Sequence, residues 1–365
     1  MEGFKVVLIG CGRISKNHMK AMADNQKYGF FAGLCDLILS RAEERQKEYL
    51  EYSGIEAKVY TDYKKMLREL HPDVAVVSTE SGNHFEVGME ALKAGCHILM
   101  EKPICMTMEE ANALCALGKE KHLTIGTCHQ NRFNPAVKKL RRAVEEGRFG
   151  RIHSITARIL WTRDDHYYQM ASWRGTEAQD GGTLMNQCIH NIDLLRWMMG
   201  SDVERISAER ARFMRSIEME DFGAALIRFK NKGIGIVEGS AVVYPKNLEE
   251  TLSVFGEKGT VVLGGKAVNK VEVWDFADEK AYDRENFRNR GVQRPAVRAR
   301  HGAGHPFLPQ EYREIAPSDL LGLVDQAVVA HDVARGQGTD NLTFEADGRP
   351  GPDGKPDLPA LLDPD

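Results

Sequence analysis

Apolar and polar positions alternate in two different ways along the chain. In residues 1–130, short runs that are apolar throughout alternate with segments whose apolar residues recur every three or four positions. This succession is typical of a parallel sheet covered by helices on both faces. The predicted strands are 4–9, 30–35, 59–60, 74–78, 97–100 and 123–127, and the predicted helices are 15–24, 40–52, 62–70, 84–94 and 107–121.

A second pattern begins after residue 130. A helix is predicted over 134–146, where Asn134 is a good N-cap and Pro135 suits the first helical position. Longer strands then follow one another with a single helix among them, predicted over 184–199, and such a succession is typical of a largely antiparallel sheet. The predicted strands are 152–160, 206–213, 223–229, 235–240, 252–255 and 271–276, with a hairpin turn at Lys258-Gly259.

These patterns divide the 365 residues into three segments, a length that suits two domains. We expect an α/β domain with a doubly wound parallel sheet at residues 1–130. An α+β domain with an open, mostly antiparallel sheet is expected at 131–336, ending in a helix over 319–335. Residues 337–365 are rich in Gly, Pro and Asp, which predicts a disordered tail.

Composition excludes several classes of protein. The 49 basic and 53 acidic residues give a net charge of −4, which provides no general attraction to nucleic acid or to an anionic membrane. No apolar run approaches the roughly 20 residues of a membrane helix, and no signal peptide is recognisable. The seven cysteines form no C-x-x-C pair. They predict reduced thiols in a cytoplasmic protein and no metal site.

A glycine-rich turn, Gly10-Cys11-Gly12-Arg13-Ile14-Ser15, lies between the first predicted strand and the first predicted helix. In a dinucleotide fingerprint, the first glycine allows the tight turn. The second lets backbone N–H groups approach a pyrophosphate at the positive end of the helix. Ser15 stands where a third glycine is usual and is small enough to keep helix and strand close. The turn therefore predicts a dinucleotide site.

Asp36 ends the second predicted strand, where a carboxylate accepts hydrogen bonds from the ribose hydroxyls of NAD. Its charge would repel the 2′-phosphate of NADP, so NAD is the expected cofactor. Arg41 follows closely in the sequence and keeps NADP as the second possibility.

Two further segments carry groups suited to proton transfer. Glu101-Lys102-Pro103 follows the fifth strand, and ligands of open α/β sheets lie outside the carboxyl ends of the strands. Asn186 and His190 are four residues apart and share one face of the predicted helix. Together they can position and deprotonate a hydroxyl. The residues alone leave two alternatives open, a solvated lysine and a histidine held in a helix interface by Asp193.

As a set, these motifs resemble the Gfo/Idh/MocA family of sugar and polyol oxidoreductases. The resemblance covers residues 4–276 and rests on the glycine-rich turn, Asp36, Thr79 with Asn83-His84, Glu101-Lys102-Pro103, and the segment from Gly181-Gly182 to His190. It implies an N-terminal Rossmann domain, a C-terminal domain with an open, mostly antiparallel sheet, and a homodimer or homotetramer.

The resemblance also implies roles for individual residues. Lys102 and His190 would flank the oxidised carbon, and Asn186 would orient the sugar. The family commonly has Asp at position 186, and its absence argues against a proton relay there. For His84, a plain helix-start role is the alternative to cofactor contact. The implied cofactor-binding residues are Gly10, Gly12, Arg13, Ile14, Asp36, Thr79, Asn83, His84, Glu101, Lys102 and Asn131.

A narrower resemblance points to the branch that oxidises UDP-N-acetylglucosaminuronic acid at C3 of the sugar. It rests on segments 130–136, 172–176, 185–187 and 244–251. Such a substrate carries a diphosphate and a carboxylate, and planar guanidinium groups suit both. Taken singly, each arginine is equally well explained by an ion pair, and each aromatic residue by the core. The predicted substrate-binding residues are Arg132, Arg158, Arg163, Trp173 and Arg174.

The sequence thus predicts an NAD-dependent oxidoreductase that transfers a hydride from a sugar hydroxyl to nicotinamide. The base is Lys102 by resemblance or His190 by its ordinary pKa, since a lysine needs a large downward shift to act near neutral pH. The alternatives are a dehydrogenase or reductase of a free sugar, an inositol or a keto-sugar, and a non-catalytic cofactor sensor.

Overall fold

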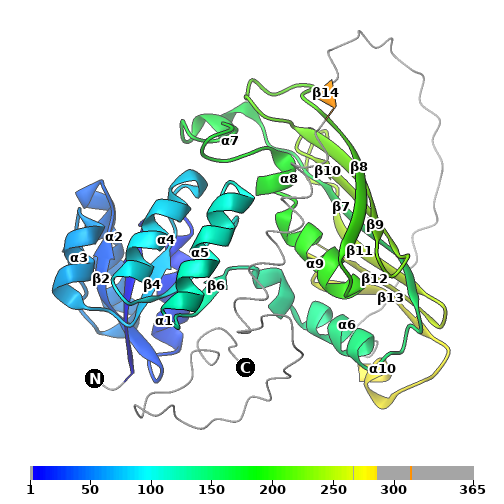
Figure 1. Ribbon diagram of the computed structural model, residues 1–365, viewed down its shortest axis with the longest axis horizontal. Coiled ribbons are helices and arrows are strands. Elements are labelled where there is room, and N and C mark those ends of the chain that lie inside the picture. Colours follow the sequence, from blue (N-terminus) through cyan, green and yellow to red (C-terminus); the bar gives the residue numbers. More distant parts are fainter. Residues whose placement is uncertain (1–2, 266, 286–312, 315–365) are drawn as a thin grey trace.

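The computed structural model describes residues 3–265, 267–285 and 313–314. It contains two sheets, and each is covered by its own set of helices (Figure 1). The predicted helix over 319–335 and the predicted tail at 337–365 lie outside the described residues. No helix in the described ranges has both the length and the hydrophobicity needed to cross a membrane.

The first sheet has the strand order β3-β2-β1-β4-β5-β6, and all its strands are parallel. Its order reverses between β1 and β4, which is where the ligand crevice of a doubly wound sheet lies. The strands are β1 (Phe4–Ile9), β2 (Gly29–Cys35), β3 (Lys58–Tyr60), β4 (Val74–Val77), β5 (His97–Met100) and β6 (Ile125–Thr127).

Helices cover both faces of this sheet. Met19 of α1 and Tyr49 of α2 are buried with Val6 and Leu8 on one face. The other face carries α3, α4 and α5, whose buried side chains pack on Val7 and Ile9. The fold class expected for this part of the chain is confirmed. The helices are α1 (Ser15–Asp24), α2 (Leu39–Ser53), α3 (Tyr63–Leu70), α4 (His84–Lys93) and α5 (Met108–Glu120), with short 3₁₀ helices η1 (Ser81–Asn83) and η2 (Gln130–Phe133).

The second sheet has the order β13-β12-β11-β7-β10-β9-β8-β14. Among its described pairs only β7–β10 is parallel, so the expectation of a mostly antiparallel sheet is confirmed. The strands are β7 (Ile152–Leu160), β8 (Val203–Ala211), β9 (Phe222–Phe229), β10 (Ile234–Ser240), β11 (Glu249–Gly256), β12 (Gly259–Gly264), β13 (Lys270–Phe276) and β14 (Arg313–Glu314).

One face of the second sheet carries the helices that lie toward the first domain (Figure 1). Ile155, Ala157 and Ile159 of β7 are buried there against α6, α8 and α9. The alternate residues of the strands point to the outer face, where Leu226 and Ile236 are exposed. The remaining helices are α6 (Pro135–Glu145), α7 (Asp165–Gln169), α8 (Thr183–Asn186), α9 (Ile189–Met199) and α10 (Ala281–Glu285).

Four points of local structure differ from the expectations. Strand β12 was not foreseen, nor was the short helix α7. Asn134 precedes α6 with Pro135 at its start, but its side chain caps nothing, because Nδ2 donates to the Ala267 carbonyl 2.6 Å away. The single helix expected over 184–199 is two helices, separated by Gln187 and Cys188.

Candidate active site

The glycine-rich turn between β1 and α1 has the geometry that a pyrophosphate needs. Gly10 has φ +98°, and a Cβ atom there would lie 2.5 Å from the Ser78 carbonyl oxygen, so only glycine fits. A Cβ atom on Gly12 would meet no protein atom within 4 Å and would fill the open space above the turn. The first turn of α1 has no side-chain cap and no acidic residue; Asn17 N already donates to the Ile14 carbonyl, so an anion would have to accept from the N–H groups that precede it.

Asp36 is tied to the same turn. Its Oδ2 accepts a hydrogen bond from Cys11 N at 2.9 Å, and its Oδ1 accepts one from Ile38 N at 2.9 Å. Each oxygen of an ionised carboxylate retains further acceptor capacity. Asp36 is therefore held where it can accept two ribose hydroxyls. Arg13 and Ile14, directly before α1, are exposed.

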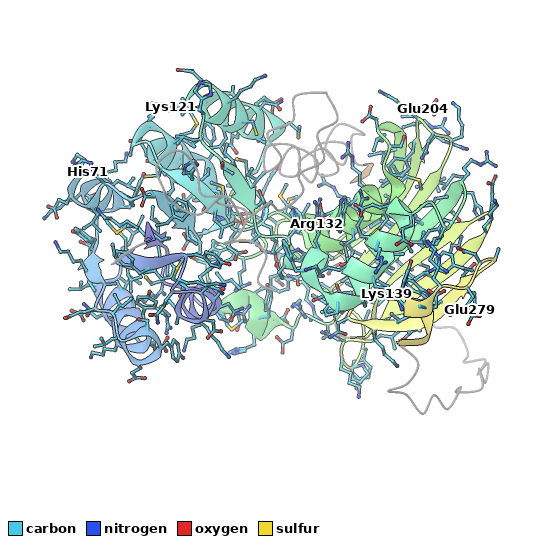
Figure 2. All side chains as sticks on the ribbon, turned by 90° about the horizontal axis from the view of Figure 1, so that it is seen from below. His71, Lys121, Arg132, Lys139, Glu204 and Glu279 are labelled. Carbon is cyan, nitrogen blue, oxygen red and sulfur yellow. The ribbon has the colours of Figure 1, made fainter. Side chains whose placement is uncertain are left out.

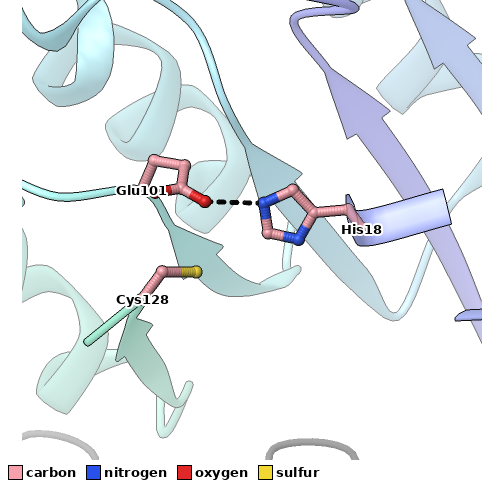
Figure 3. A group of neighbouring side chains, drawn as sticks. All are labelled: His18, Glu101 and Cys128. Carbon is pink, nitrogen blue, oxygen red and sulfur yellow. Dashed lines mark hydrogen bonds and ion pairs between the residues drawn. The ribbon is translucent and has the colours of Figure 1, made fainter. Parts of the chain in front are cut away.

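Glu101 links the end of β5 to α1, the helix that follows the glycine-rich turn. Its carboxylate lies 2.8 Å from His18 Nε2 of α1 (Figure 3), and it is close enough to the Cys128 thiol to raise the pKa of that thiol further, beyond the effect of burial. The ligand atoms of these three side chains lie within 4.8 Å of one another, which is a spacing that a metal ion could bridge. These contacts already account for the cluster. We assign Glu101 a structural role: it anchors the segment that carries Lys102.

Lys102 reaches across from the first domain to the second. Its Nζ donates to the main-chain oxygen of Asn186 at 2.7 Å and lies 3.3 Å from Asn186 Oδ1. In a continuous helix the Asn186 carbonyl would accept from residue 190; here it accepts from Lys102 Nζ, and α8 and α9 are separate helices. Burial lowers the pKa of Lys102 below its ordinary value, and the nearby carboxylates of Glu101 and Asp180 oppose that fall.

His190, the first-turn residue of α9, faces the same region. The Gln130 amide nitrogen lies 3.3 Å from His190 Nε2, and His129 packs edge-on at 5.5 Å between ring centroids. Because an amide nitrogen only donates, Nε2 is the acceptor and Nδ1 carries the ring proton. That Nδ1 is buried and has no partner among the described residues. Burial, Lys102 and His129 all lower the pKa of His190, so the ring is neutral at physiological pH.

Sequence analysis missed Asp180. It lies in the loop before α8 and is buried, with Oδ2 accepting from Gly175 N at 2.6 Å and Oδ1 accepting from Asn186 Nδ2. Asp180 immediately precedes Gly181-Gly182, but a single acid in a loop has no periodicity to mark it.

Two of the predicted substrate-binding arginines lie on a group of aromatic rings near Lys102. Arg174 stacks over Tyr167 at 4.3 Å and over Trp173 at 4.8 Å, and its buried Nε has no partner in the described part of the chain. Arg163 stacks over Trp161 at 4.6 Å. Burial lowers the pKa of Arg163, and the charge of Arg13 on the glycine-rich turn adds to that effect.

Neither of these arginines has an ion-pair partner within the described ranges, although Arg163 donates to Gln187 and to the Thr162 carbonyl. Arg174 is also close enough to Lys102 and Asp180 to affect their pKa values. The second domain therefore presents two cations toward the first, beside the Lys102 site.

Arg132 and Arg158 have other partners. Arg132 makes two hydrogen bonds to the buried carboxylate of Asp193, at 2.7 and 2.5 Å, and lies over the Trp197 ring at the junction of the two domains (Figure 2). Arg158 alternates with the buried residues of β7 and so lies on the outer face of the sheet, paired with Glu238 and Glu249. The structure does not bring Arg158 to the site, because its strand position points it away.

The Arg132–Asp193 pair gives a prediction about stability. Replacing Arg132 with alanine leaves a buried carboxylate without its main partner, so we expect unfolding free energy to fall by roughly 3 kcal/mol. Urea denaturation measures this. The matched control is Arg151→Ala, which removes an exposed pair with Glu257 and should cost under about 1 kcal/mol. Equal stabilities of the two variants would contradict a structural role for Arg132.

Four other predicted cofactor-binding residues have different surroundings from one another. Both ring nitrogens of buried His84 face carbonyls, Pro103 O at 2.7 Å and Thr79 O at 3.2 Å, so the ring joins two loops and has no free atom for the cofactor. Exposed Asn83 donates to Glu80, and Thr79 is half-buried. Asn131 is buried, and its amide donates to Glu250 in the second domain at 3.2 Å, so the structure does not place it at the cofactor crevice.

Comparisons with known proteins identify the family to which this chain belongs. The model of an oxidoreductase family with an NAD-binding Rossmann fold matches residues 4–129, and that of a GFO/IDH/MocA C-terminal domain matches residues 137–262. The WlbA dehydrogenase from Bordetella pertussis, solved in complex with NADH and UDP-GlcNAcA, is 35% identical, with a TM-score of 0.73 over 78% of this chain and 80% of that one. The chain belongs to the Gfo/Idh/MocA family.

Other relatives in the Gfo/Idh/MocA family span more than one substrate class. The WlbA dehydrogenase from Chromobacterium violaceum, also solved with NADH and UDP-GlcNAcA, is 30% identical with a TM-score of 0.75, over 93% of this chain and 98% of that one. Myo-inositol 2-dehydrogenase of Thermotoga maritima is 27% identical, over 70% of this chain and 74% of the relative. The chain is thus an NAD-dependent dehydrogenase that acts on a CH–OH group, with an NAD-binding Rossmann domain, and the expectation of NAD is confirmed.

Proposed function

We propose that the protein oxidises C3 of a UDP-N-acetylhexosaminuronic acid. The observation that carries this proposal is the pair of guanidinium groups Arg163 and Arg174. Arg174 is close enough to Lys102 to affect its pKa, Arg163 donates to Gln187 next to Asn186, and neither forms an ion pair within the described part of the chain. An uncharged inositol or free sugar gives such groups nothing to neutralise. A diphosphate and a carboxylate give both of them charge-assisted hydrogen bonds.

The relatives support the same substrate class. Both WlbA structures contain UDP-GlcNAcA, and they resemble this chain at 30–35% identity. The inositol dehydrogenase is less similar, at 27% identity, and oxidation of a free polyol is the alternative that it favours. The charge of the site is the property that separates the two substrate classes.

In the proposed reaction Lys102 is the base and His190 is a hydrogen-bond donor. A neutral lysine amine has two N–H groups and one lone pair, and the two oxygens of Asn186 are placed to accept those N–H groups. The lone pair is then available to take the proton of the substrate hydroxyl. NAD⁺, when bound, supplies the acceptor for the hydride that leaves the same carbon.

His190 is less suited to be the base. Its pKa is lowered well below 6.5, so the neutral ring is a weak base at neutral pH. Its Nδ1–H is buried and has no partner in the described part of the chain, and with Nε2 facing the Gln130 amide this leaves the ring without a free lone pair to take a proton. Sequence analysis left Lys102 and His190 as equal candidates, and the environments of the two groups favour Lys102.

Substrate binding to the NADH form tests the proposal. By titration calorimetry we expect UDP-N-acetylglucosaminuronic acid to bind and myo-inositol to show no binding at the same concentration. Arg174→Gln should weaken the UDP-sugar by about 10- to 100-fold, the value of one charge-assisted hydrogen bond.

Arg158→Gln is the matched control, because it removes the same charge from the outer face of the second sheet. It should leave the dissociation constant unchanged. Tighter binding of the polyol than of the UDP-sugar, or equal effects of the two substitutions, would overturn the proposal.

A further inference from the structure

Asp180 has two hydrogen-bond donors and almost no contact with solvent. It is 2% exposed, and its two oxygens accept from Gly175 N and from Asn186 Nδ2. Its loop is held against the first domain, since Gly82 N donates to the Gln179 carbonyl at 3.3 Å. A Cβ atom on Gly82 would come within 2.4 Å of the Ala178 carbonyl oxygen. The carboxylate is therefore fixed at the domain junction, one side chain away from Lys102.

The two ends of the Asn186 amide face different partners. Nδ2 faces Asp180, and Oδ1 faces Lys102 Nζ at 3.3 Å and Gln187 Nε2 at 3.0 Å. An ionised carboxylate only accepts and an amide nitrogen only donates, so Asp180 determines which way the amide points. If the amide turned over, its NH₂ group would face two other donors.

We propose that Asp180 is the positioning residue of this site, which holds the Asn186 carbonyl oxygen toward Lys102 and thereby directs the Lys102 amine at the substrate. The inference rests on the proposed role of Lys102 as the base. Asp180 does not touch the reacting atoms. It acts through a hydrogen bond to Asn186. Asp180, six residues earlier in the chain, thereby supplies the negative charge that an Asp at position 186 would supply directly.

The charge of Asp180 also acts on Lys102 across the amide. Its attraction favours the ammonium form and opposes the effect of burial on the pKa of Lys102. Burial in turn raises the pKa of Asp180, and the hydrogen bonds from Gly175 and Asn186 counter that rise. Removal of the carboxylate charge should therefore move the pKa of Lys102 further down.

Asp180→Asn disrupts the arrangement of hydrogen-bond donors and acceptors around Asn186 in a defined way. The substituted side chain has one acceptor oxygen for two donors, Gly175 N and Asn186 Nδ2, so one of them loses its partner or the Asn186 amide turns over. The double variant Asp180→Asn, Asn186→Asp restores the pattern. The new amide at position 180 accepts from Gly175 and donates to the new carboxylate at position 186, which accepts from Lys102 and Gln187.

Turnover of the UDP-sugar should separate these variants. We expect Asp180→Asn to lower kcat by about 100-fold with a small change in KM, and to move the acidic limb of its pH profile to lower pH. The double variant should recover to within about 10-fold of the wild type, with the limb moved back up. Glu177→Gln, an exposed acid in the same loop, is the control and should change neither value.

A second measurement needs no substrate. Acetic anhydride labels neutral amines, so the labelling of Lys102 against pH, read by peptide mass spectrometry on the NADH-bound protein, gives its titration directly. The midpoint should fall in Asp180→Asn and rise again in the double variant. If these shifts appear while the UDP-sugar is not oxidised, the substrate proposal fails and the role of Asp180 stands.

Two results would overturn the inference: an unchanged labelling midpoint in Asp180→Asn, or a double variant no more active than the single one. If Asp180→Asn does not fold, Asn186→Asp replaces it. That variant places two carboxylates together near Lys102, so its labelling midpoint should lie above that of the wild type. The double variant, which again has one carboxylate, should bring it back.

Discussion

Replacement of Lys102 with methionine is expected to lower kcat by about 1,000-fold, within the range that a general base contributes. The Lys102 amine is held by the two oxygens of Asn186, and no other amine in the described ranges is hydrogen-bonded to Asn186. Methionine keeps the length of the side chain and removes the proton acceptor. NADH should still bind, as followed by fluorescence, because the glycine-rich turn and Asp36 are untouched.

The pH dependence distinguishes the two candidate bases. Since Lys102 acts in its neutral form and burial lowers its pKa, wild-type kcat should rise with pH through a limb below 10.5. His190→Asn should keep that limb at a reduced rate, because the histidine is only a donor. If Lys102→Met retained more than about a tenth of the wild-type rate, or if the limb vanished in His190→Asn, the base would be misassigned.

Alanine substitutions at the two glycines of the turn should affect different properties. Gly12→Ala should weaken NADH binding, whereas Gly10→Ala should destabilise the fold. In Gly12→Ala the new methyl group meets no protein atom within 4 Å, so stability should be unchanged. The same methyl occupies the space that the pyrophosphate needs, and we expect NADH affinity to fall by about 100-fold, close to 3 kcal/mol. Calorimetric titration with NADH and thermal unfolding measure the two quantities.

Gly10→Ala is the matched comparison. Its methyl would lie 2.5 Å from the Ser78 carbonyl at φ +98°, so the unfolding free energy should fall by about 3 kcal/mol or more. A Gly12→Ala protein that binds NADH as tightly as the wild type would show that the cofactor lies elsewhere. A Gly12→Ala protein as unstable as Gly10→Ala would show that the space above the turn is not open.

Much of the fold was predictable because each domain has a regular pattern. Fully apolar strands between amphipathic helices gave the six parallel strands of the first sheet, and the strand ends placed Asp36 and Lys102 at its carboxyl edge. Strand β12 was missed although it alternates buried and half-buried residues, because Gly259 was assigned to a turn. Gly259 is both the end of the predicted hairpin turn and the first residue of β12.

The parts of the site that sequence reasoning missed depend on contacts across the chain. The Asn186 carbonyl accepts from Lys102, 84 residues earlier in the chain, and no local pattern announces that contact. Arg132 finds its carboxylate 61 residues away. Alternation along β7 was visible, but which face would be covered was not, and so Arg158 was assigned to the wrong side. Asp180 needed the folded loop to bring it to Asn186.

The central claim is that this site oxidises C3 of a UDP-N-acetylhexosaminuronic acid with Lys102 as the base. The most direct test is to incubate the protein with NAD⁺ and UDP-N-acetylglucosaminuronic acid, with 2-oxoglutarate added to reoxidise any retained cofactor, and to follow the sugar by mass spectrometry. We expect the loss of two hydrogens, including a deuterium placed at C3, and no loss with Lys102→Met. An unchanged UDP-sugar alongside oxidation of myo-inositol or a free sugar would contradict it.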